Sequence, residues 1–174
     1  ENVERLSTAV RLTGDQGIMR SLRMVKSEAE IDKIRTACAI AGRAFDRVPA
    51  IARAGVPLSQ VFRDFQRLCL AEGADWVPYL AGGAGPMGYD DVISPASDTP
   101  LAHGDVLMLD TGLVYDGYFC DYDRNFAIGA ANPTAKATHA RLIDAVEAAM
   151  ECAKPGATAA DLFHAMDRIL TGGA

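Results

Sequence analysis

The stretch LMLDTGLVYDGYFCDYDRNF, residues 107–126, decides how the rest of this sequence is interpreted. At its centre Asp116-Gly117 stands between two tyrosines, which is a strong signal for a two-residue β-hairpin with a type I′ turn. That turn fixes an antiparallel register in which Tyr115 lies opposite Tyr118. The stretch therefore predicts two paired strands.

Three aspartates of this hairpin fall on one face of the predicted sheet. Side chains alternate between the two faces of a strand, so Asp110, Asp121 and Asp123 share a face. Asp110 and Asp121 are diagonal neighbours, with β-carbons at most ~7–8 Å apart. Gly112 lies opposite Asp121 and is expected to leave an open pit beside it. Arg124 points to the other face and is poorly placed to neutralise the acids.

These carboxylates need a compensating charge if they lie inside a domain. Burying them ionised and unpaired costs on the order of several kcal/mol or more. Exposure on the wet face of an antiparallel sheet is the alternative. Met108, Val114 and Phe119 share the acids' face, which disfavours that alternative. A bound cation is the more economical explanation, and oxygen ligands indicate Mn, Mg, Fe, Co or Zn. A diagonal carboxylate pair also suits two metals about 3.5–4 Å apart that activate water for hydrolysis.

The composition describes a globular protein. The chain has 174 residues, enough for one domain with a core. Its net charge of -6 argues against a nucleic-acid or anionic-membrane partner. Neither a membrane span nor a signal peptide is visible, and we expect a cytoplasmic location. Two disulfides are possible by count, but the spacing of the four cysteines favours buried, reduced thiols; they are Cys38, Cys69, Cys120 and Cys152.

Two amphipathic helices are predicted before the hairpin. Ser27 and Glu30 form a capping box that opens the first helix, which fades around residues 49–54. Gly55 breaks the chain, and a second helix follows until Gly73 stops it.

The flanking segments are less regular. Glycines and prolines predict an irregular region from residue 76 to about residue 105. Residues 1–23 have weak periodicity and are expected to be the end of an upstream domain or a linker. Residues 24–174 are then expected to belong to a separate domain.

Two further helices follow the hairpin and repeat the first pair. Asn132-Pro133 opens the third helix, and a fourth follows the break at Gly156. One fixed offset superposes the two pairs, which predicts an internal duplication. The second unit ends where its own strands should begin. The superposed positions are Gly55 with Gly156, Val61 with Leu162, Phe62 with Phe163, Phe65 with Met166, Arg67 with Arg168, and Leu68 with Ile169.

The hairpin resembles a signature of the creatinase/aminopeptidase (pita-bread, M24) metallopeptidase family. The resemblance covers about residues 18–174, and the opening of the first helix is similar to that of Xaa-Pro dipeptidases and aminopeptidases P. It implies an α+β pita-bread fold: a pseudo-two-fold duplicated helix pair plus an antiparallel sheet, with the second half incomplete. Residues 24–174 would then be the N-terminal portion of a pita-bread catalytic domain. The residues that carry it are Gly104-Asp105, Leu109-Asp110-Thr111-Gly112, Tyr115-Asp116-Gly117-Tyr118 and 121–126.

The resemblance also implies a metal site and a reaction. Asp110 would bind one metal and Asp121 would bridge two divalent ions (Mn, Co, Fe or Zn), which activate water to attack an amide in a small peptide. The family's other ligands, a histidine and two glutamates, would lie beyond residue 174, since His139 and His164 are on predicted helices. These 174 residues alone are therefore expected to be inactive, and the full protein is expected to form a homo-oligomer.

Three departures from the family's pattern keep other functions open. Residues 91–95 stand where family peptidases carry a substrate-side histidine, and His103 is expected at a turn instead. Asp123 and Asn125 replace a hydroxyl residue and a threonine. These departures favour a relative that acts on a small molecule, as creatinase, ectoine hydrolase or dimethylsulfoniopropionate lyase do. A non-catalytic remnant of a metal site is the remaining alternative.

Overall fold

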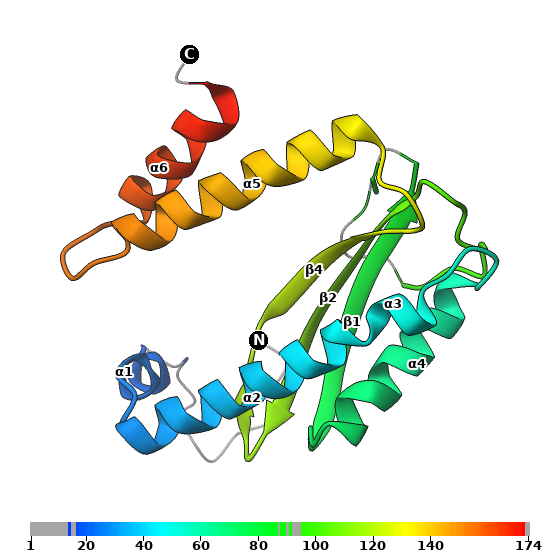
Figure 1. Cartoon of the computed structure of the whole chain (residues 1–174). Helices are drawn as coiled ribbons and strands as arrows, with labels where there is room; N and C mark the ends of the chain where they lie inside the picture. Colours follow the sequence, from blue (N-terminus) through cyan, green and yellow to red (C-terminus); the bar gives the residue numbers. More distant parts are fainter. Residues whose placement is uncertain (1–13, 15–16, 87, 90, 92–94, 173–174) are drawn as a thin grey trace.

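Helices precede and follow a block of antiparallel strands (Figure 1). The structure is a computed structural model and describes residues 14, 17–86, 88–89, 91 and 95–172. The helices are α1 (Ile18–Met24), α2 (Glu28–Asp46), α3 (Val48–Ile51), α4 (Leu58–Ala71), α5 (Pro133–Cys152) and α6 (Ala159–Thr171). The strands are β1 (Trp76–Gly85), β2 (Val106–Tyr115), β3 (Tyr118–Phe119) and β4 (Tyr122–Ala127).

Strand β2 is the centre of the sheet. It pairs antiparallel with β1 along one edge and with β3 and β4 along the other. Tyr115 lies opposite Tyr118, and Asp110 lies opposite Asp123, so the register predicted from the sequence is confirmed.

The hairpin turn has the predicted geometry. Asp116 and Gly117 have φ values of 46° and 79°, as a type I′ turn requires at both central residues. The returning strand is interrupted between β3 and β4, at Cys120 and Asp121. The register is the same on both sides of the interruption, and the backbone N–H of Cys120 still donates to the carbonyl of Leu113 at 3.1 Å.

The predicted irregular region from residue 76 is wrong for its first ten residues, because they form β1. Gly82 in this strand marks a close approach between strands rather than a loop. A Cβ added at Gly82 would collide with the backbone carbonyl of Met108 on β2. The register also shifts between Trp76 and Tyr79, around Pro78, which is where a proline is tolerated in a sheet.

One face of the sheet is buried beneath α2 and α4. Leu107, Leu109 and Leu113 on β2 are fully buried, and each such side chain contributes roughly 1.5–3 kcal/mol. Phe45 of α2 and Phe65 of α4 meet above them, with ring centroids 4.7 Å apart. Because alternate residues of β2 are held under the helices, the intervening residues, Asp110 among them, must face the other side.

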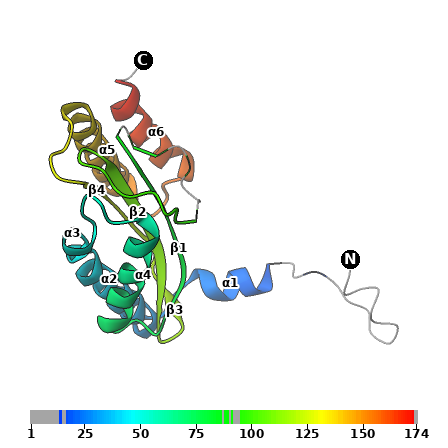
Figure 2. The ribbon, with the colours of Figure 1, turned by 90° about the vertical axis from the view of Figure 1, so that its right-hand side faces the viewer.

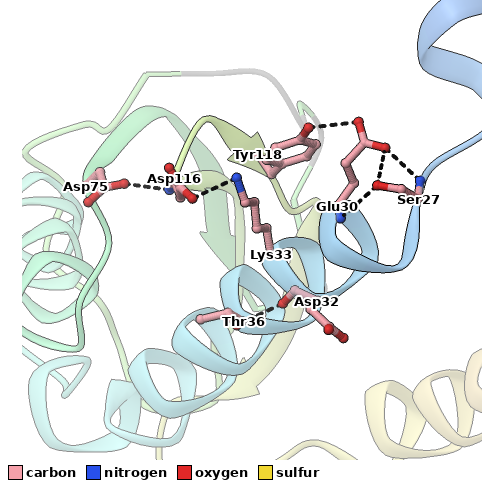
Figure 3. A network of polar contacts seen from close by, with 8 residues as sticks. All are labelled: Ser27, Glu30, Asp32, Lys33, Thr36, Asp75, Asp116 and Tyr118. Atoms are coloured by element: carbon pink, nitrogen blue, oxygen red, sulfur yellow. Dashed lines mark hydrogen bonds and ion pairs between the residues drawn. The ribbon is translucent and has the colours of Figure 1, made fainter.

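The capping box anchors α2 to the hairpin, as Figure 3 shows. The Glu30 carboxylate accepts hydrogen bonds from the Ser27 backbone N–H at 2.6 Å and from the Tyr118 hydroxyl at 2.8 Å. Lys33, one turn further along α2, forms an ion pair with Asp116 at 2.8 Å. The start of α2 is thereby tied to the turn itself and to the strand that follows it.

The second helix pair repeats the first. The offset that superposes Gly55 on Gly156 also places the start of α4, Leu58, on the start of α6, Ala159. Both glycines are left-handed, with φ values of 88° and 95°. The Asn132 side chain caps α5 by accepting from Ala135 N at 3.0 Å, as predicted. The pseudo-two-fold duplication is therefore present in the fold.

The helices α5 and α6 pack on each other, each with one buried alanine, Ala145 and Ala165, and contribute no residue to the main described hydrophobic cluster under the sheet. In Figure 1 they extend away from the end of the sheet. Met150 is 71% exposed and Phe163 is 62% exposed. Within the described residues no strand follows α6.

Helix α1 projects from the rest of the molecule (Figure 2), and all of its residues are exposed. Most of the segment 1–23 lies outside the described residues. The expected boundary between residues 23 and 24 stays a prediction.

The capping box makes a pH-dependent prediction. The hydrogen bonds from Ser27 and then Tyr118 lower the pKa of Glu30 from its ordinary value of 4.5 to about 2. The stabilisation by the Glu30 carboxylate is therefore complete above about pH 4.5 and is lost as pH falls toward 2. We expect Glu30→Gln to lower the free energy of unfolding at pH 6, with a difference from wild type that shrinks below pH 4.5, in urea titrations.

Glu28→Gln is the matched control, since Glu28 lies in the same first turn of α2. Its effect should be smaller and should depend less on pH. Equal effects of the two substitutions at every pH would contradict the role given to Glu30.

Candidate metal centre

Asp110 and Asp121 converge on one point on the open side of the sheet, which is the face that α2 and α4 do not cover. The Oδ1 atom of Asp110 lies 3.3 Å from the hydroxyl oxygen of Tyr79, and the Oδ1 atom of Asp121 lies 3.0 Å from the same oxygen. The two carboxylates therefore lie on one side of the sheet and close together. The sequence predicted this juxtaposition from the hairpin register, and the structure has it.

The pit expected above Gly112 is not open. Tyr79 lies directly opposite Gly112 in the β1–β2 register, and a Cβ added at Gly112 would collide with the Tyr79 ring. The tyrosine ring thus fills the space that the glycine leaves. The prediction of a vacant pit was wrong because the third strand of the sheet, β1, was taken for a loop.

The electrostatics of the pair reflect crowding of like charge. Burial, and then the charge of Asp121, raise the pKa of Asp110, while the hydrogen bond from Tyr79 lowers it in part. Burial and the hydrogen bond to Asp121 raise the pKa of Tyr79. The phenol therefore stays protonated and acts as a donor, but it brings no positive charge.

Asp123 and Arg124 separate onto the two faces as predicted. The Asp123 carboxylate is exposed, opposite Asp110 on the open face. The Arg124 guanidinium lies 4.2 Å from the ring centroid of Tyr122, which in turn stacks on Phe45 on the helix side of the sheet. The hydrogen bond of Arg124 reaches only the backbone carbonyl of Asp123. Arg124 therefore does not neutralise the carboxylates.

Comparison with known proteins identifies the family. A model of metallopeptidase family M24 matches residues 32–174. The chain belongs to this family. The probable dipeptidase PepE of Mycobacterium tuberculosis is 35% identical over 154 residues, which are 88% of this chain and 41% of that protein. The Xaa-Pro dipeptidase of Pyrococcus horikoshii is 31% identical over 151 residues, 83% of this chain and 41% of that protein.

Solved structures of the family share the fold. The prolidase from Pyrococcus furiosus superposes with a TM-score of 0.83 at 25% identity, and the match covers 92% of this chain and 48% of the prolidase. The fold is the pita-bread fold. The chain spans less than half the length of each of these relatives.

Within the described residues of this M24 chain, no group of three or more His, Cys, Asp or Glu side chains could hold a metal ion. His139 lies on α5, His164 lies on α6 and His103 occupies a turn, as expected. All four cysteines are free thiols, and burial raises the pKa of the Cys69 thiol to about 12. The described residues thus supply a carboxylate pair, which fits part of an oxygen-rich site.

One feature of the site was not predicted from the sequence. Tyr79 was missed, although alternation along Trp76–Gly85 would have placed it beside Gly112 once those residues were recognised as a strand. The loop position of the missing family histidine falls within residues 91–95, of which 92–94 lie outside the described residues.

None of the described helices is long and apolar enough to cross a membrane.

Crowding at the pair predicts an unusual mutational effect. Like charges that face each other across strands destabilise a sheet by about 0.2–1 kcal/mol. We expect Asp110→Asn, in protein stripped with a chelator, to raise the free energy of unfolding by up to about 1 kcal/mol at pH 7.5. The gain should vanish near pH 4 and grow as pH rises, because the raised pKa of Asp110 means that its ionisation opposes folding.

Urea titrations at both pH values would measure this gain. Asp64→Asn on α4 is the control, because Asp64 accepts hydrogen bonds from Gln60 and Arg67 and its substitution should destabilise or be neutral. A loss of stability in Asp110→Asn at pH 7.5 would show that its carboxylate is held favourably without a cation.

Proposed function

We propose that the protein that carries this chain is a metal-dependent hydrolase of the Xaa-Pro dipeptidase or aminopeptidase type. The observation that supports it is the convergence of two carboxylates, Asp110 and Asp121, at one point on the open face of an M24 sheet. Asp110 is half-buried and Asp121 is exposed, and their like charges repel each other across the strands. The described side chains provide a hydroxyl but no cation at that point.

In this proposal Asp110 and Asp121 would hold divalent metal, with Mn, Co, Fe or Zn as candidates. Metal bound there would supply an activated water and stabilise the oxyanion of the attacked amide. Asp110 and Asp121 supply the negatively charged oxygens, and the register of the sheet fixes the side on which these oxygens lie. Two carboxylates are too few ligands, so these 174 residues alone are proposed to be inactive. Self-association and a cytoplasmic location stay predictions.

Metal titration tests the site directly. In the intact protein we expect Asp110→Asn and Asp121→Asn each to weaken Mn²⁺ binding by at least about tenfold, measured by isothermal titration calorimetry. Peptidase activity on Xaa-Pro dipeptides should fall with metal occupancy. Asp64 lies on α4, which covers the opposite face of the sheet, so Asp64→Asn should bind Mn²⁺ like wild type. Unchanged affinity in both site variants would refute the assignment.

A second reaction is favoured by one specific observation. The exposed acid Asp123 stands opposite Asp110, where the family pattern has a hydroxyl residue, and so adds negative charge beside the proposed reaction centre. This departure fits a small amide or other small molecule as substrate in place of a proline peptide.

A substrate panel separates the two. We expect the intact, Mn²⁺-loaded protein to cleave Xaa-Pro dipeptides with a higher kcat/KM than small molecules such as creatine, a guanidine, or an N-acetylated diamine, an amide. The reverse ranking would replace the peptidase assignment by the small-molecule one. Cleavage of neither class, in a protein that binds metal normally, would favour a non-catalytic role.

A further inference from the structure

Tyr79 makes more contacts with the carboxylate pair than its half-exposed position suggests. Its hydroxyl lies within hydrogen-bond distance of both Asp110 and Asp121, although a phenol has only one hydrogen to donate. The contacts use one oxygen of each carboxylate, Oδ1 in both cases. The second oxygen of each carboxylate is left for another ligand.

The tyrosine is held in place by the two residues that follow Asp110. The hydroxyl of Thr111, which is fully buried, donates to the backbone carbonyl of Tyr79 at 2.9 Å. Gly112 lies opposite Tyr79 and its missing side chain makes the space that the ring occupies. The run Asp110-Thr111-Gly112 therefore provides a carboxylate, a backbone anchor and a ring seat, all directed at one tyrosine.

We propose that Tyr79 is a positioning residue of the metal centre, with Thr111 and Gly112 as its seat. This inference rests on the proposed metal site. Without metal, the hydroxyl offsets part of the repulsion between the carboxylates and keeps both on the open face. With metal, it donates to a ligand carboxylate and fixes the direction in which the free oxygens point, which is the usual work of an outer hydrogen bond at a metal site.

The geometry separates this role from a purely structural one. A purely structural tyrosine would need only its ring, since the ring alone fills the space above Gly112. The hydroxyl is therefore the group to test, and Phe is the substitution that removes it while leaving the ring.

The test is metal affinity in the intact protein. We expect Tyr79→Phe to weaken Mn²⁺ binding about tenfold in isothermal titration calorimetry, within the range that loss of an outer hydrogen bond to a metal ligand produces. Tyr89→Phe is the matched control: Tyr89 is a tyrosine whose hydroxyl is hydrogen-bonded to Asn125 rather than to the pair. Its affinity should equal that of wild type.

Gly112→Ala tests the seat independently. The added Cβ must displace the Tyr79 ring, so the same loss of affinity is expected, and Gly112→Ala combined with Tyr79→Phe should lose little more than either alone. Full additivity of the two losses would overturn the proposal that they act through one hydrogen bond.

These measurements test the metal site and the role of Tyr79 separately. If Asp110→Asn binds Mn²⁺ like wild type, the metal site is wrong and the role of Tyr79 falls with it. If Asp110→Asn loses the metal while Tyr79→Phe binds it as tightly as wild type, or more tightly, only the positioning role is overturned. Should Tyr79→Phe fail to fold, the wild-type protein gives the answer. Adding Mn²⁺ must perturb the near-ultraviolet absorption of tyrosine, and an unchanged spectrum overturns the proposal.

Discussion

Two like charges held at one point of a β-sheet are the constraint on which the rest of this structure depends. Asp110 and Asp121 come from neighbouring strands, and both reach the hydroxyl of Tyr79 on a third. That arrangement requires β1, β2 and the returning strand to keep one register, because a slip of one residue would turn a carboxylate into the core. The two-residue turn, the glycine at position 112 and the buried anchor at Thr111 all serve that register.

The helices fix which face of the sheet is available for chemistry. The leucines of β2 are buried under α2 and α4, and this burial forces Asp110 to the opposite side. The contacts of Glu30 and Lys33 with the hairpin tie the start of α2 to the turn that sets the register. Core packing and site geometry are thus two consequences of the same alternation along one strand.

Sequence patterns predicted those parts of the molecule whose physics is local. The capping box at Ser27, the cap at Asn132 and the type I′ turn depend on residues close together in the chain, and all are present. The repeat of the helix pairs is present too, because each pair is formed from one continuous segment. Strand β1 was missed because its glycines resemble those of a loop. Gly82 is required by the approach of the Met108 carbonyl, and that approach exists only after β1 has paired with β2.

The sequence by itself determined the hairpin register and hence that Asp110 and Asp121 share a face, because alternation along a strand needs no information from elsewhere. It also carried the resemblance to family M24, through the spacing of the acids and glycines. Only the tertiary structure decided what stands between the carboxylates. Tyr79 is distant in the chain, and it reaches the pair because a third strand pairs with β2 and because Gly112 leaves room for its ring.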